Sequence, residues 1–252
     1  MEINLKENER IDDLEYKGLK IIQNKNWFCF GIDSILLSDY AKKIKKDTKV
    51  LDLGTGTGIL GILLCEKTKL KNIYGIEIQK EVAEMAGRSI KLNNLENKFE
   101  IINDDINNLK RYFNRGEIDA IVTNPPYKKA NSGLINDNEV KLISRHEVKC
   151  KLEQLIEISS YLLKDGGEFY LVHRPERLVD VLELLRKNKI EPKNIRFVHP
   201  KMNTNPNLFL LKAVKLAKPF LMVEEPLYVY DEDGKYCKQI LEIYNKCEER
   251  KG

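Results

Sequence analysis

Short apolar runs alternate with amphipathic segments along most of the chain. Each run has the length of a buried strand, and the segment after it repeats apolar residues at helical spacing. Strands that alternate with helices predict βαβ units around a mostly parallel sheet. We expect strands at residues 50–53, 73–78, 99–102, 118–122 and 168–172, and helices at 59–67, 80–93, 109–113, 152–163 and 177–187.

The two ends of the chain depart from this alternation. Residues 195–198 and 208–214 both resemble strands, with only a Pro- and Asn-rich loop between them, which predicts an antiparallel strand that closes the sheet. Residues 19–30 predict a hairpin around Asn24-Lys25-Asn26, followed by a helix that Asp33 or Ser34 caps. A strand at 227–230 and a helix at 236–247 form an appendage. We therefore expect an N-terminal extension (1–48), an α/β core (49–218) and a C-terminal appendage (219–252) in one structural unit.

The composition is that of an ordinary globular protein, with 42% hydrophobic and 33% charged residues in a chain of 252. No apolar run approaches the roughly 18–20 residues of a membrane span, and the first residues lack the apolar core of a secretory signal. We therefore expect a cytoplasmic protein that does not contact the membrane, as a monomer or a weak dimer. The cysteines form no Cys-x-x-Cys pair and the histidines lie far apart, so no metal site is expected.

Positive charge gathers in one part of the chain, although the net charge is only +4. Residues 186–218 contain nine Lys and Arg against one acid, whereas residues 219–252 are net acidic. A polyanion-binding surface needs such a concentration of positive charge. A solvated lysine-rich face has the same pattern, so both interpretations stay open.

A glycine-rich turn joins the first core strand to its helix, in Asp52-Leu53-Gly54-Thr55-Gly56-Thr57-Gly58. Glycine allows a tight reversal and close approach of a ligand, and the amides that begin the helix point at whatever lies above the turn. Position 59 is Ile where a dinucleotide fingerprint would have its third glycine, and the Gly-Lys-Ser/Thr ending of a phosphate loop is missing. The turn therefore fits NAD poorly.

Acidic residues follow the next two strands at the same edge of the predicted sheet. Glu77, followed by Ile78, lies 19 residues beyond Gly58 and can accept hydrogen bonds from ribose hydroxyls. Asp105 can accept from an adenine amino group while Ile106 packs on the ring. A glycine turn alone is compatible with a purely structural role. With both acids in phase, the pattern predicts a nucleoside-type cofactor.

The fourth core strand runs into Asn124-Pro125-Pro126-Tyr127. Two prolines stiffen this turn, so the Asn124 side-chain oxygen and the Pro125 carbonyl form a rigid pair of acceptors for an amino group. Acceptors placed out of the plane of a conjugated amine favour a tetrahedral nitrogen with a directed lone pair, which stabilises a transition state. Tyr127 can stack on the planar group. The alternative is a structural role, in which the proline turn only ends the strand.

These motifs resemble those of class I S-adenosylmethionine-dependent methyltransferases, and Asn124-Pro125-Pro126-Tyr127 is similar to the signature of enzymes that methylate planar amino nitrogens. The segments at 30–37, 144–147 and 173–178 resemble the bacterial tRNA(Val) adenine-37 N6-methyltransferase family. The resemblance implies a Rossmann-like, seven-stranded α/β sheet with an antiparallel C-terminal strand. It also implies S-adenosylmethionine as cofactor and tRNA as partner, with cofactor contacts from Phe30, Asp33, residues 52–58, Glu77, Asp105 and Asn124.

Several basic residues are candidates for contact with RNA. Residues 128–151 form a long polar stretch that we expect to be a mobile lid, and its Arg145 and His146 are candidate phosphate contacts. Arg174 and Arg177 can bind phosphate, or form ion pairs with Glu176 or Glu183. The basic segment contributes Lys193, Arg196 and Lys201.

Three alternatives compete with tRNA adenine methylation. A glutamine N5-methyltransferase of a release factor shares both main motifs, but a helical domain is expected before its glycine turn, and only 49 residues precede Val50 here. A DNA adenine methyltransferase would need an additional target-recognition domain. A non-catalytic RNA-binding protein on this fold need not keep the glycine turn, Glu77 and Asn124 together.

Overall fold

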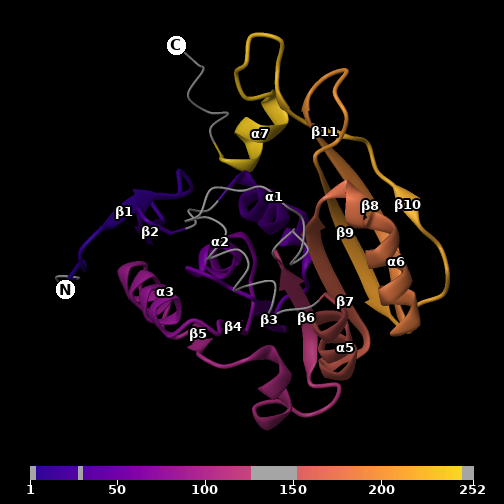
Figure 1. Ribbon diagram of the computed structural model, residues 1–252, viewed down its shortest axis with the longest axis horizontal. Coiled ribbons are helices and arrows are strands. Elements are labelled where there is room, and N and C mark those ends of the chain that lie inside the picture. Colours follow the sequence, from indigo (N-terminus) through magenta and orange to yellow (C-terminus); the bar gives the residue numbers. More distant parts are fainter. Residues whose placement is uncertain (1–3, 28–30, 126–151, 246–252) are drawn as a thin grey trace.

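The computed structural model describes residues 4–27, 31–125 and 152–245. Its centre is a nine-stranded sheet in the order β10-β8-β9-β7-β6-β3-β4-β5, with β11 also paired to β8 (Figure 1). The strands are β3 (Lys49–Leu53), β4 (Asn72–Ile76), β5 (Phe99–Ile102), β6 (Ile118–Thr123), β7 (Leu163–His173), β8 (Ile190–Lys201), β9 (Leu208–Lys215), β10 (Met222–Val223) and β11 (Leu227–Tyr230).

Strands β3 to β7 are mutually parallel, and β9 lies antiparallel between β7 and β8. This arrangement confirms the predicted α/β sheet of seven strands with one antiparallel member. Two short strands that were not counted in that expectation, β10 and β11, extend the sheet because both pair parallel to β8. The segment after residue 218 thus continues the sheet, while the division of the chain into three parts stays a prediction.

The helices cover both faces of this sheet. They are α1 (Ile32–Tyr40), α2 (Ile59–Lys67), α3 (Lys80–Leu92), α5 (Leu152–Leu162), α6 (Leu178–Lys187) and α7 (Lys238–Ile243), with 3-10 turns η1 (Ala41–Lys43), η2 (Ile106–Arg111) and η3 (Pro175–Arg177). One core cluster joins the sheet to α1, α2 and α7, and the other joins it to α5 and α6. Val50 belongs to the first cluster and Leu51 to the second, because successive strand residues face opposite sides. Burial on both faces explains why the core strands are continuous apolar runs.

The N-terminal extension contains an antiparallel hairpin, as expected. It is formed by β2 (Lys20–Asn24) and the upstream strand β1 (Glu9–Asp13). The second strand expected after Asn24 falls largely on residues 28–30, which lie outside the described residues. Strand β1 escaped detection because four of the five residues in Glu-Arg-Ile-Asp-Asp are charged. The predicted cap was wrong, since Gly31 is the N-cap of α1 and places Asp33 and Ser34 in the first helical turn. In the described parts of the chain, no helix has the length and apolarity needed to cross a membrane.

Candidate active site

The glycine turn connects the end of β3 to α2 through three glycines in the left-handed region. The φ angles are 72° at Gly54, 57° at Gly56 and 87° at Gly58, values that an L side chain adopts only with strain. The amides of Gly54 and Thr55 both donate to the carbonyl of Ile76, which ties the turn to the end of β4. A Cβ built on Gly54 or Gly56 would meet no atom within 4 Å. The turn is therefore anchored on the sheet side and open on the other side.

Two buried carboxylates lie beneath this turn. Asp52 is 1% exposed and accepts a hydrogen bond from the Thr55 hydroxyl at 2.6 Å. Burial raises the pKa of Asp52 to about 7, and the nearby charge of Glu77 adds to that rise. Glu77, also 1% exposed, accepts from the amide of Gly56 at 3.1 Å and from that of Gln79 at 2.9 Å. The structure thus brings Asp52, the turn and Glu77 together, as the sequence predicted.

The end of β5 contributes the third element of the site. The Asp105 side chain caps η2 and accepts from the amide and the side chain of Asn107, while Ile106 is buried. Sequence reasoning missed Asn103, whose side-chain nitrogen donates to the Glu77 carbonyl at 2.8 Å and joins the ends of β4 and β5. An exposed asparagine in a loop carries no periodic or motif signal, so no pattern marked it.

Asn124 lies directly after β6 and is held by two neighbouring elements. The Thr123 hydroxyl donates to the Leu53 carbonyl at 2.8 Å, which fastens the end of β6 beside the glycine turn. The Asn124 side-chain nitrogen donates to the Ser34 hydroxyl of α1 at 3.0 Å. Because this bond occupies one end of the amide, the side-chain oxygen is directed away from Ser34. The predicted partners Pro126 and Tyr127 lie outside the described residues, as does the predicted cofactor contact Phe30.

Gly61 is a structural residue that sequence reasoning also missed. A Cβ at Gly61 would lie 2.3 Å from the Phe99 ring, so glycine allows α2 to pack closely against β5. Counted from Gly56, the glycines at 56, 58 and 61 have the dinucleotide spacing, so the objection based on Ile59 does not hold. The third glycine of that fingerprint serves the same close packing of helix on strand. The spacing alone therefore does not exclude a dinucleotide.

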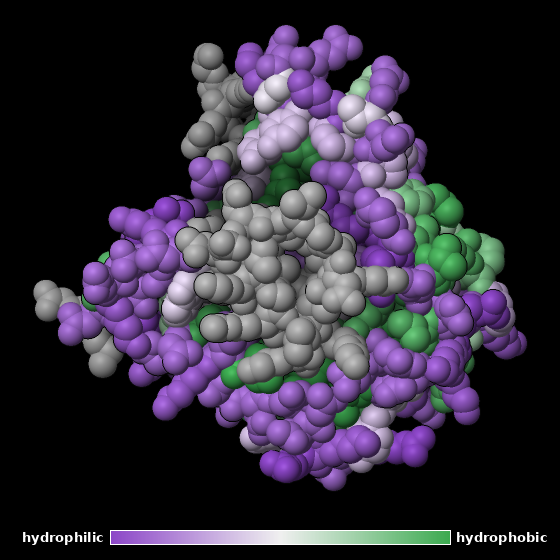
Figure 2. Space-filling model, in the orientation of Figure 1, coloured by the Kyte–Doolittle hydropathy of each residue, from purple (hydrophilic) through white to green (hydrophobic). Residues whose placement is uncertain are grey.

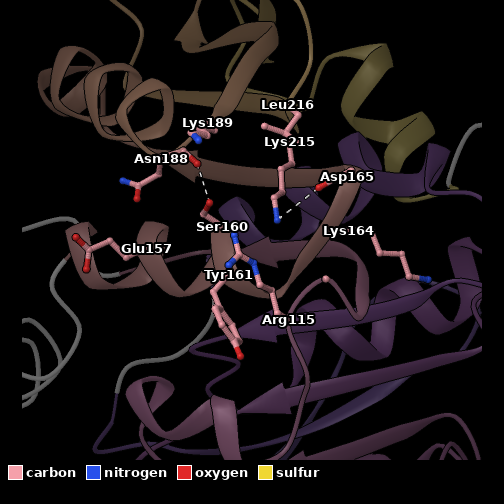
Figure 3. Close-up of a pocket in the computed structure, with 11 residues that line it drawn as sticks. Arg115, Glu157, Ser160, Tyr161, Lys164, Asp165, Asn188, Lys189, Lys215 and Leu216 are labelled. Carbon is pink, nitrogen blue, oxygen red and sulfur yellow. Dashed lines mark hydrogen bonds and ion pairs between the residues drawn. The ribbon is translucent and has the colours of Figure 1, made fainter.

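The basic segment, residues 186–218, is divided between the two ends of the strands. Lys201 ends β8 at the carboxyl end of the parallel strands, where the glycine turn lies. Ile190 pairs with Lys215, and both lie at the opposite, amino end of the parallel strands. A cavity of about 690 Å³ lies at this amino end of the parallel strands, lined in part by Arg115, Lys189 and Lys215. Figure 3 shows the Arg115 and Lys215 side chains approaching each other from opposite walls of this cavity. Much of the positive charge is thus remote from the candidate active site.

The other basic candidates at the carboxyl end of the parallel strands follow β7. Arg174 donates to the Asn207 carbonyl, and Arg177 forms an ion pair with Asp180 at 2.6 Å rather than with Glu176 or Glu183. On β8, Arg196 donates to the Glu225 carbonyl and to the Gln239 side chain. Lys193 donates to the Lys218 carbonyl. Arg145, His146 and the expected lid lie outside the described residues.

Comparisons with known proteins agree on one family. The family model for the methyltransferase small domain matches residues 20–188. A tRNA1(Val) (adenine(37)-N6)-methyltransferase from Tolumonas auensis is 27% identical over 229 residues, which cover 90% of this chain and 93% of that protein. One from Porphyromonas gingivalis is 30% identical over 175 residues, or 68% of each chain. A crystal structure of a predicted O-methyltransferase from Agrobacterium tumefaciens has a TM-score of 0.68 at 19% identity, covering 85% of this chain and 96% of that one, and this similarity concerns the fold.

Proposed function

We propose that this chain, which belongs to the methyltransferase small domain family and is an S-adenosylmethionine-dependent methyltransferase, methylates N6 of adenine 37 in tRNA1(Val). The observation that carries the proposal is Asn124, held by Ser34 at the end of β6 beside the glycine turn. Relatives that bear this activity align with most of the chain. A cytoplasmic location is part of the proposal, since tRNA is the substrate.

The residues present fit the cofactor. The open side of Gly54 and Gly56 leaves room for a ligand to approach the backbone, and Glu77 keeps a second lone pair on each carboxylate oxygen for ribose hydroxyls. The buried Glu77 supplies negative potential for a sulfonium cation, and Asp52 adds to it once its carboxyl group, with a pKa of about 7, is ionised. Asp105 and Ile106 are assigned to the adenine ring. Asp33 is assigned a contact by resemblance, and Ile78 is assigned one as the residue that follows Glu77.

When bound, the cofactor supplies a methyl group that is already electrophilic. The chain itself has to position the target amine and stabilise its changing charge. The Asn124 side-chain oxygen and the Pro125 carbonyl accept the two amino hydrogens, which turns the nitrogen lone pair towards the methyl group. Ser34 acts as a positioning residue, because its hydroxyl fixes the orientation of the Asn124 amide.

Asn124→Ala provides the test. With labelled methyl donor and an unmodified tRNA1(Val) transcript, we expect kcat to fall by roughly 100-fold or more, while cofactor affinity measured by calorimetry changes much less. Ser34→Ala should lower kcat by about 10-fold, as expected for loss of an orienting hydrogen bond. Asn114→Ala is the matched control, because Asn114 is exposed and bonds only to Glu117 among the described residues.

Mass spectrometry of the product identifies the substrate. Release factor and a transcript with guanine at position 37 serve as alternative acceptors. Methylation of a release-factor glutamine without methylation of tRNA would replace the proposed substrate, and full activity in Asn124→Ala would overturn the assigned role of Asn124.

The proposed RNA contacts lie at different distances from the candidate active site and can be tested separately. Lys201 lies at the end of β8 next to the candidate active site, and Lys193 lies near the other end of β8. We expect Lys201→Glu to weaken tRNA binding and to reduce the salt dependence by about one phosphate contact, and Lys193→Glu to do so less. Equal effects would favour a surface that spans the whole basic segment.

A further inference from the structure

The outer edge of the sheet carries an unusual run of exposed apolar residues. In the edge segment, defined as residues 218–225, Phe220 is 68% exposed, Leu221 41%, Met222 48% and Val223 64%. Figure 2 shows a hydrophobic patch over β10 on the right of the molecule. Single exposed apolar residues are common, but here four follow one another, and the last two form the edge strand β10. An exposed apolar edge of this kind is a template for pairing with another strand.

The backbone of this segment has one side free for pairing. Strand β10 runs parallel to β8, and the Glu224 amide donates to the Ile195 carbonyl at 2.8 Å. Alternate residues of a strand direct their amides to the same side, so Met222 also faces β8, whereas Val223 faces outwards. If the extended backbone of β10 continues by one residue on pairing, Leu221 faces outwards as well. Among the described strands, none pairs with this outer side.

We propose that a second copy of this chain pairs with the edge segment, antiparallel and about a two-fold axis at Leu221. An isologous interface requires a surface that complements itself. Hydrogen-bonded pairs have to join outward-facing residues, so Leu221 lies opposite Leu221 of the copy. The same register places Phe220 opposite Met222 and Lys218 opposite Glu224.

Charge selects this register. Lys218 is exposed, and its side chain forms no ion pair within the described part of the chain. The Glu224 carboxylate lies 3.4 Å from the Tyr40 hydroxyl and has no cationic partner there. Centred on Leu221, the pairing brings Lys218 to Glu224 at both ends of the interface. A register centred on Met222 would instead place Phe220 opposite Glu224, an apolar ring against a carboxylate.

The flanking prolines limit the strength of this association. Pro219 and Pro226 have no amide to donate, so the two segments share only a few backbone hydrogen bonds, chiefly those of Leu221 and of the Val223 amide. The dimer is therefore expected to be weak and dependent on concentration.

Analytical ultracentrifugation of the full chain, from micromolar to several hundred micromolar, tests the proposal. The wild type should shift from monomer to dimer, and Leu221→Lys should remain monomeric. Val179→Lys is the matched control, because Val179 is an exposed apolar residue of α6 (75% exposed) outside the edge segment. Circular dichroism of each variant verifies the fold.

Charge reversal tests the register. Lys218→Glu and Glu224→Lys should each weaken dimerisation by about tenfold, because like charges then face each other at both ends. The double variant should recover it, and an equimolar mixture of the two single variants should form a heterodimer. A wild type that stays monomeric throughout, or that binds tRNA through Leu221 without dimerising, overturns the proposal. Equal association of Leu221→Lys and Val179→Lys, or single reversals without effect, also overturns it.

Discussion

Replacing Gly61 with alanine adds one methyl group where α2 packs against the Phe99 ring of β5. The built Cβ lies 2.3 Å from Phe99 Cζ and 2.4 Å from Cε1, whereas ordinary contacts begin at 3.4 Å. The ring or the helix therefore has to move by roughly 1 Å in a close-packed core. Phe99 is 2% exposed, so its ring has no free space in which to rotate away.

The steric cost of the added methyl group is partly offset by the higher helix propensity of alanine. Overpacking of a core costs about 1–3 kcal/mol, and alanine in place of a helical glycine returns up to about 1 kcal/mol. We expect the free energy of unfolding to fall by about 1–2 kcal/mol and Tm by roughly 2–4 °C per kcal/mol. Gly58 contacts the same ring, since its built Cβ lies 3.5 Å from Phe99 Cε1. Displacement of the ring or α2 should therefore also weaken cofactor binding.

Urea unfolding and calorimetric cofactor titration measure the two effects. Gly87→Ala is the matched control, because Gly87 lies inside α3 and its built Cβ would meet no atom within 4 Å. That variant should gain up to about 1 kcal/mol and bind cofactor normally. Phe99→Leu should cost less in the Gly61→Ala background than in the wild type. If Gly61→Ala and Gly87→Ala were equally stable, the steric argument would be refuted.

Three further predictions concern buried charge. The pKa of Asp52 is raised from 3.8 to about 7, so between these pH values the folded chain holds a proton that the unfolded chain has released. The stability that this proton contributes is therefore lost as pH rises from about 4 to about 7. Free energies of unfolding of wild type and Asp52→Asn that run parallel over this window would contradict the prediction. Burial lowers the pKa of His173 from 6.5 to about 4, so its ring should stay neutral in NMR titrations above about pH 5.5, and stability should be lost as pH falls from 6.5 towards 4; a ring midpoint near 6.5 would contradict this prediction. Arg88 donates to both oxygens of Glu9, whose side chain is 4% exposed. Arg88→Ala should therefore lower the free energy of unfolding by about 2 kcal/mol in urea unfolding and expose the N-terminal hairpin to proteolysis. The control Lys6→Ala breaks an exposed pair with Glu84 and should cost less than about 1 kcal/mol.

Most core elements were predictable because strands buried on both faces of a parallel sheet are continuous apolar runs in the sequence. The apolar run at 50–53 became β3, and the glycines after it became a left-handed turn tied to β4. Strand β1 was not predictable, since its charged residues carry no apolar period and it forms by pairing with β2. The candidate site shows the same division: Glu77 and Asp105 were found from their places after strands, whereas Asn103 was not.

By itself, the order of the residues determined the alternation of strands and helices, the glycine turn and the Asn-Pro-Pro motif, because hydrophobic period and turn chemistry operate over a few neighbouring positions. The tertiary structure alone decided that Ser34 meets Asn124 across 90 positions of the chain. It likewise decided that Gly61 admits the Phe99 ring, that the basic segment is split between the two ends of the strands, and that β10 is left as an edge. Contacts of this kind depend on how distant elements pack, and packing depends on the shape of the whole core rather than on any local pattern.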